Sequence, residues 1–161
     1  IDGHTNRLEL AKRCGADITI NINEIREPRD RVERIKELTE NRGADIGVEV
    51  VGKPFAVSEG LEMLRSRGTY VELGHITPNS MLSLDVSRLV AKQIRLLGVG
   101  HYDPGIIPMG LDFLVRTRDK YALTCIVSHQ FPLEQINEAF EASEWFNRQG
   151  GSQVTRAIVT P

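Results

Sequence analysis

The feature that most constrains the fold is a unit of strand, helix, glycine and strand that runs from residue 44 to residue 74. Residues 44–52 form an apolar, β-branched stretch typical of a buried parallel strand, and this stretch ends at a glycine. Pro54 opens a helix that Gly68 closes, and residues 69–74 form a second strand that also ends at a glycine. Strands joined by helices in this way predict an α/β fold with a parallel sheet and right-handed crossovers.

The same alternation continues on both sides of this unit. Before it, the residue patterns predict helices over 5–14 and 28–41, with a short β-branched strand over 16–21 between them. After it, they predict a short strand over 81–84, a helix over 87–90 capped by Asp85, and a strand over 94–100.

The rhythm changes after residue 102. A turn leads into a helix that contains residues 109–115, and a strand over 125–129 and a helix over 133–142 follow. Residues 150–152, rich in glycine, lead to a last strand over 156–160. Four leucines at helical spacing are predicted to be core residues: Leu61, Leu64, Leu111 and Leu114.

Charge and apolar patterning argue against several classes of partner. Acidic and basic residues are interspersed and the formal net charge is -2, so no basic stripe favours nucleic acid or an anionic membrane surface. The sequence shows neither an apolar run long enough for a membrane span nor a signal-peptide pattern. We therefore expect no nucleic-acid or membrane partner and a cytoplasmic location.

The cysteines and histidines have no spacing typical of a metal site. Cys14 and Cys125 are far apart in sequence, and the 4 histidines show no H-x-x-x-H pattern. The spacing rules therefore predict reduced thiols and no metal ligands within the chain.

The first residues contain a candidate ribose-binding acid. Ile1 and Asp2 precede a polar turn and an amphipathic helix, as at the end of the second strand of a dinucleotide-binding unit. In such units the acid accepts hydrogen bonds from the adenosine ribose and follows a glycine-rich phosphate loop by about twenty residues. Because the sequence begins at Ile1, we expect the chain to be a piece of a larger enzyme. The alternative, in which Asp2 is only a turn or capping acid, stays open.

Other candidate positions also have plainer interpretations. Gly52 and Gly74 fit helix-entry turns that bind no ligand, and Arg156 fits a solvated charge on a strand. Glu49 and Glu72 interrupt apolar strands, and the sequence alone assigns them no role.

With its strands placed, the chain resembles the medium-chain, zinc-containing alcohol dehydrogenase family over essentially its whole length. The order and spacing of several stretches carry the resemblance. They are ID-x4-R-x-ELAKRCGAD at 1–17, GADIGVEVVG at 43–52, RGTYVELG at 67–74, LDVSRLVAKQIRLLGVG at 84–100, FPLEQINEAFE at 131–141 and TRAIVTP at 155–161.

The resemblance implies coenzyme-binding roles. Asp2 matches the ribose-binding acid, which repels the 2′-phosphate of NADP and so favours NAD, and Arg7 matches a basic position near the same ribose. The positions matched to the coenzyme further along the chain are Val51, Gly52 and Lys53 beside the adenine and its ribose, Leu73, Gly74 and His75 on the nicotinamide side, Gly100 and His101 near the carboxamide, and Arg156 at the pyrophosphate. His75 and His101 replace apolar residues common in the family, which leaves their side-chain roles open.

The resemblance also implies a reaction: reversible hydride transfer between an alcohol and the nicotinamide, with a zinc ion as Lewis acid. The family's zinc ligands and glycine-rich loop precede the matched region, so we assign no catalytic residue and no metal ligand within this chain. The expected fold is an incomplete Rossmann-type, doubly wound parallel sheet, with a partial NAD-binding domain over 1–102 and a segment over 103–161 that returns to the catalytic domain.

A sheet without its first, central strand leads us to expect that the isolated chain is poorly stable and binds NAD weakly or not at all. For the full-length protein the resemblance implies a small alcohol or carbonyl substrate and a homodimer or homotetramer.

Three other functions are considered. A zinc-free quinone or enoyl reductase of the same superfamily usually uses NADPH, and Asp2 argues against it. A Rossmann-like methyltransferase also holds a ribose with an acid, but it would end in an antiparallel hairpin, which residues 106–118 and the closing strand do not suggest. A non-catalytic nucleotide-binding module would contain a complete G-x-G-x-x-G loop, and the sequence has none.

Overall fold

The computed structural model describes residues 1–75, 78–143 and 154–161. The chain divides into two compact units, one formed by residues 25–103 and the other by residues 1–24 together with 104–161. The predicted functional boundary between residues 102 and 103 remains a prediction. In the described ranges, no helix is both long enough and apolar enough to span a membrane.

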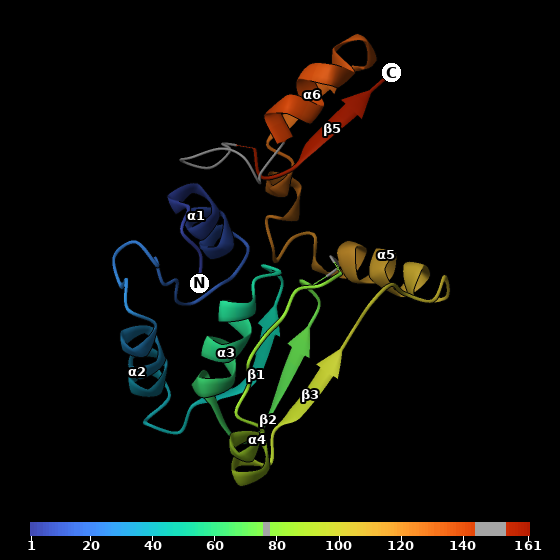
Figure 1. The fold of residues 1–161 in the computed structure, drawn as a ribbon. Coiled ribbons are helices and arrows are strands. Elements are labelled where there is room, and N and C mark those ends of the chain that lie inside the picture. Colours follow the sequence, from blue (N-terminus) through green and yellow to red (C-terminus); the bar gives the residue numbers. More distant parts are fainter. Residues whose placement is uncertain (76–77, 144–153) are drawn as a thin grey trace. The chain divides into compact units, whose positions relative to one another are not determined.

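The unit of residues 25–103 contains a parallel sheet of three strands in the order β1-β2-β3 (Figure 1). In the register of the sheet, Val48 pairs with Val71 and Val71 pairs with Leu97. The elements of the unit are α2 (Pro28–Leu38), β1 (Ala44–Glu49), α3 (Pro54–Met63), β2 (Leu64–Glu72), α4 (Val86–Lys92) and β3 (Arg95–Gly98). The predicted α/β fold with parallel strands is confirmed.

Local sequence explains where these helices begin. Proline occupies the first turn of α2 and of α3, where its missing N–H is not needed. At α4 the predicted cap is confirmed, because the Asp85 carboxylate accepts the Ser87 N–H at 3.0 Å. The end of α3 differs from the prediction: β2 begins at Leu64 rather than at residue 69, because Leu64 is extended and pairs with Ala44.

The core of this unit lies between α3 and the sheet. Val57, Leu61, Leu64 and Tyr70 form one buried cluster. The Tyr70 hydroxyl donates to the Ala56 carbonyl at 3.1 Å, so the largest core side chain is also satisfied as a polar group. The core prediction is confirmed for Leu61 and Leu64.

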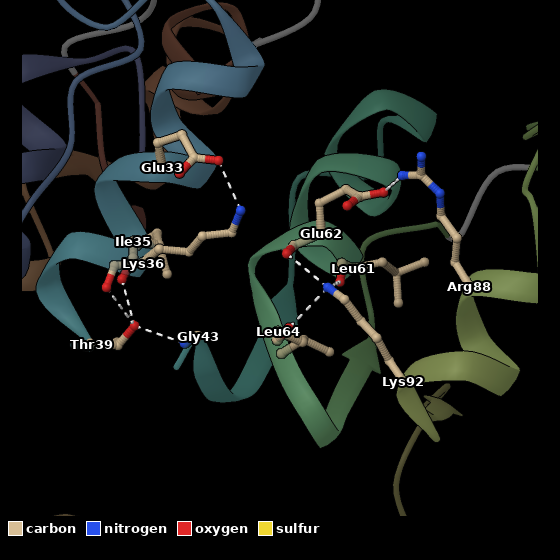
Figure 2. Close-up of polar contacts among 10 residues, drawn as sticks. All are labelled: Glu33, Ile35, Lys36, Thr39, Gly43, Leu61, Glu62, Leu64, Arg88 and Lys92. Atoms are coloured by element: carbon tan, nitrogen blue, oxygen red, sulfur yellow. Dashed lines mark hydrogen bonds and ion pairs between the residues drawn. The ribbon is translucent and has the colours of Figure 1, made fainter. Parts of the chain in front are cut away.

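Two polar side chains hold segment ends in this unit (Figure 2). The Lys92 ammonium, at the end of α4, donates to the carbonyl oxygens of Glu62 at 3.0 Å and of Leu64 at 3.1 Å, where α3 ends. Burial lowers the pKa of Lys92. The ammonium group nevertheless stabilises the two carbonyl oxygens at the end of α3, which accept no hydrogen bond within that helix. In the same way, the Thr39 hydroxyl accepts the Gly43 N–H at 2.9 Å just after α2.

The other unit contains helices and a two-stranded parallel sheet, β4 with β5, against which α6 packs. Near its start, Asp2 and Asn21 form a single parallel bridge. Its elements are α1 (Thr5–Arg13), α5 (Ile106–Thr117), the 3₁₀ turn η1 (Leu123–Ile126), β4 (His129–Pro132), the 3₁₀ turn η2 (Leu133–Gln135), α6 (Ile136–Ser143) and β5 (Ala157–Thr160). The glycine-rich residues 150–152 that lead to the last predicted strand lie outside the described residues.

Three predicted strands are wrong. Residues 16–21 pair only through the Asp2–Asn21 bridge, too short a contact for a ladder. Residues 81–84 adopt no regular element, and no described strand pairs with them. Most of 125–129 belongs to η1 or to the link after it, because the Cys125 N–H bonds back to the Ala122 carbonyl as in a 3₁₀ turn.

Two burial predictions are also wrong. Leu111 and Leu114 of α5 are 59% and 47% exposed, so they are not core residues of the described chain. On β1, Ile46 and Val48 are 65% and 59% exposed, because successive side chains of a strand point to opposite faces and these two point away from the α3 side.

Replacing Lys92 with methionine tests the contact at the end of α3. The Lys92→Met chain keeps the length of the side chain but loses the donors to the Glu62 and Leu64 carbonyls, so we expect a loss of about 1–2 kcal/mol in the free energy of unfolding. Lys36→Met, which removes the exposed pair with Glu33 and a charge that repels the Lys92 ammonium, should cost at most about 0.5 kcal/mol. Urea unfolding followed by circular dichroism measures both, and equal losses would contradict the assigned role of Lys92.

Candidate functional site at the strand ends

The candidate site lies where β1 and β2 end next to each other. Glu49 and Glu72 are the last residues of these strands and are register partners. In parallel α/β sheets, ligands bind beyond the carboxyl ends of the strands. The segments that follow, 50–53 and 73–75, therefore occupy the expected place for a ligand site.

The Glu49 carboxylate fixes the segment after β1. Glu49 is only 3% exposed. Its Oε1 atom accepts the backbone N–H groups of Val51 at 2.6 Å and of Gly52 at 2.8 Å. The side chain thus satisfies two amides at the point where the chain leaves the sheet.

Glu72 has the same role after β2. Its Oε1 atom accepts the backbone N–H groups of Gly74 and of His75, each at 3.1 Å, and lies 2.8 Å from His75 Nδ1. The Glu72 carbonyl also accepts the Val99 N–H at 2.9 Å, which ties the end of β3 to the same place.

Glycine is required at Gly52 and Gly74. Gly52 has a φ of 72°, in the left-handed region that side chains disfavour. A Cβ atom at Gly52 would overlap the carbonyl oxygen of Gly74, and one at Gly74 would overlap the backbone nitrogen of Gly52 and the Glu49 Oε2 atom. The two segments therefore meet backbone to backbone.

The two carboxyl groups shift each other's protonation. Burial raises the pKa of Glu49, and the neighbouring Glu72 raises it further, although the N–H donors of Gly52 and Val51 oppose this. For Glu72, burial also acts upward, but the neighbouring Glu49 carboxyl group and the hydrogen bonds with His75 hold its pKa below the ordinary value. Ionising both carboxyl groups without a compensating cation is unfavourable in this place.

Most of the residues matched to the coenzyme follow the strands of this sheet. His101 adopts a left-handed backbone, with a φ of 59°. The residues that follow β1 are Val51, Gly52 and Lys53, those that follow β2 are Leu73, Gly74 and His75, and Gly100 and His101 come shortly after β3.

The remaining candidates lie in the other unit. Asp2 Oδ1 accepts the His4 N–H at 2.8 Å, and Asp2 Oδ2 lies 3.9 Å from Arg7 Nη1. The structure thus brings Asp2 and Arg7 together at the start of α1. The Arg156 side chain is exposed just before β5, and its carbonyl accepts the Ser128 N–H at 2.9 Å.

Glu49 and Glu72 have no role that the sequence alone assigns, although they organise the strand ends. A signal was present: each acid interrupts an apolar strand and precedes a glycine by two or three residues. An acid at such a position can reach the amides of the turn that follows.

The strand ends of the sheet allow close approach of a dinucleotide and also offer ligand atoms to a metal ion. Glycines at adjoining strand ends permit close approach of a ligand to the backbone. In the other unit, the Asp2 carboxylate can accept a hydrogen bond from a ribose hydroxyl. Glu49, Glu72 and His75 each offer one oxygen or nitrogen atom, and these atoms lie within 4.8 Å of one another.

Residues 1–116 match the model of a protein family described as zinc-binding dehydrogenase, so the chain belongs to this family. The family predicted from the sequence is confirmed.

Among curated relatives, the erythritol/L-threitol dehydrogenase of Mycolicibacterium smegmatis is 34% identical over 142 residues, covering 88% of this chain and 37% of the relative. The sorbitol dehydrogenase of Bacillus subtilis is 32% identical over 147 residues, covering 89% of this chain and 38% of the relative. This chain therefore spans less than two fifths of the length of these relatives.

A solved structure supports the same fold. The crystal structure of an alcohol dehydrogenase from Thermotoga maritima superposes with a TM-score of 0.81 at 32% identity, covering 87% of this chain and 38% of that one. The predicted incomplete Rossmann-type sheet is confirmed.

A Cβ atom at Gly52 tests the backbone contact with Gly74. In Gly52→Ala we expect a loss of about 1–3 kcal/mol in the free energy of unfolding, because the added methyl group meets the Gly74 carbonyl and the backbone is left-handed. Gly98→Ala is the matched control: its Cβ would meet nothing within 4 Å, so its effect should stay within about 0.5 kcal/mol. Similar denaturant midpoints for the two variants would rule out the close contact.

Proposed function

We propose that these residues form the coenzyme-binding portion of an NAD-dependent alcohol or polyol dehydrogenase, which transfers a hydride between an alcohol and NAD. The observation that carries the proposal is the meeting of Gly52 and Gly74 at the carboxyl edge of a parallel sheet, in a chain of the zinc-binding dehydrogenase family. Relatives named as polyol dehydrogenases support the substrate class.

Bound NAD would accept or supply the hydride. The residues of this chain orient it: the turns held by Glu49 and Glu72 present backbone rather than side chains, and Arg156 offers a permanent cation to the pyrophosphate. The catalytic zinc of such an enzyme would be held by residues outside this chain, and we assign no catalytic residue here.

Preference for NAD is proposed to depend on Asp2. Its carboxylate suits the ribose hydroxyls and repels a 2′-phosphate. Arg7, only 3.9 Å from Asp2, would attract that phosphate if Asp2 were absent. The pair therefore sets the balance between the two coenzymes.

A zinc-free quinone or enoyl reductase of the same superfamily is the alternative, and it would favour NADPH. The cytoplasmic location, the homodimeric or homotetrameric assembly and the weak coenzyme binding of the isolated chain remain predictions.

Substitution of Asp2 tests the proposed coenzyme preference. In the natural gene product that contains these residues, Asp2→Ala should weaken NAD binding by about tenfold, the loss of about 1.4 kcal/mol, and should improve NADP binding relative to NAD. Isothermal titration calorimetry with each coenzyme measures both effects. The control is Asp17→Ala, which removes an exposed acid of the same unit and should leave both affinities unchanged. Tighter binding of NADP than of NAD by the unmodified protein would favour the reductase instead.

A further inference from the structure

Three potential metal ligands meet at the ends of β1 and β2. They are Glu49, Glu72 and His75, and their ligand atoms lie within 4.8 Å of one another. Spacing rules for metal sites do not detect this cluster, because Glu49 is far in sequence from Glu72 and His75. The register pairing of Glu49 with Glu72 brings the three residues together.

Two carboxylate oxygens of this cluster are buried and lack hydrogen-bond donors. The Glu49 side chain is 2% exposed, and its Oε2 atom accepts no hydrogen bond from any residue that the structure describes. The Oε2 atom of Glu72 is also buried and accepts no hydrogen bond from the described residues. Buried polar atoms without a partner are rare in folded proteins. A bound cation would give these two oxygens a partner and would compensate the charge of the two carboxylates.

The distances suit a small divalent cation. His75 Nδ1 lies 3.5 Å from Glu49 Oε2 and 2.8 Å from Glu72 Oε1. In tetrahedral coordination with ligand bonds of about 2.0–2.1 Å, neighbouring ligand atoms are about 3.3 Å apart. Small side-chain adjustments would therefore place all three ligands around one ion.

Surrounding hydrogen bonds hold the two carboxylates in place. Each uses Oε1 for the amides of the following turn, which orients the group. Toward His75 Nδ1, Glu49 presents Oε2 at 3.5 Å and Glu72 presents Oε1 at 2.8 Å. Two carboxylates and a doubly charged cation are together neutral, so the ion removes the cost of burying both acids.

We propose that Glu49, Glu72 and His75 bind a divalent transition-metal ion, with Zn²⁺ the best match to two oxygen ligands and one imidazole. Three protein ligands leave a fourth position for water or another ligand. The site joins the ends of two strands, and it is distinct from the catalytic zinc expected outside this chain. It goes beyond the proposed dehydrogenase function and does not depend on it.

Zinc titration of the metal-stripped natural gene product that contains these residues tests the site. We expect the unmodified protein to bind one more Zn²⁺ per protomer than His75→Gln, by calorimetry and by elemental analysis. Glu72→Gln and His75→Gln should each weaken binding by at least about tenfold. His75 is partly exposed and not in the core, so its replacement keeps the test valid even if Glu72→Gln fails to fold. Glu37→Gln, which alters an exposed acid of α2, is the matched control and should bind like the unmodified chain.

X-ray absorption at the zinc edge then identifies the ligands. A zinc equivalent with nitrogen and oxygen neighbours only, whose imidazole signal is lost in His75→Gln, would support the site. Equal zinc contents and equal zinc-edge spectra for the unmodified protein and His75→Gln would overturn the proposal. The proposal would also be overturned if stoichiometric zinc were absent and the infrared spectrum kept the band of a protonated carboxylic acid. In that case the two glutamates share a proton and bind no ion. Coenzyme titrations are measured separately, so failure of NAD binding would not be mistaken for failure of this site.

Discussion

The hydrogen bonds from backbone amides to two buried carboxylates determine how the chain leaves the sheet. Glu49 accepts two N–H groups after β1, and Glu72 accepts two after β2. Because the two acids are register partners, both turns lie at one edge, and Gly52 and Gly74 come into backbone contact there. The proposed coenzyme-binding surface and the proposed cation site both depend on this pair of interactions.

The regular part of the fold was predictable because local and tertiary signals agree. Pro54 opens α3 and Asp85 caps α4, as the sequence indicates. The failures occur where only tertiary pairing decides: the β-branched stretch 16–21 has a single bridge, and residues 81–84 have no described partner strand. The core prediction for Leu111 is wrong for a related reason: helical spacing shows which face of a helix is apolar but not whether another element covers that face.

At the strand ends, the sequence indicates the two glycines but not the interactions around them. Gly52 and Gly74 each follow an apolar strand, and glycine is the residue that their close backbone approach requires. Their role in coenzyme binding remains a proposal. The roles of Glu49 and Glu72 could not be read in the same way. An acid in a strand is compatible with exposure, pairing or burial, and only the register of β1 with β2 shows that the two carboxylates face each other.

Amide hydrogen exchange measured by NMR tests the central claim that these carboxylates hold the turns. We expect slow exchange at Val51, Gly52, Gly74 and His75, since each amide donates to a glutamate oxygen. Exchange of these four amides as fast as that of an unstructured chain would contradict it.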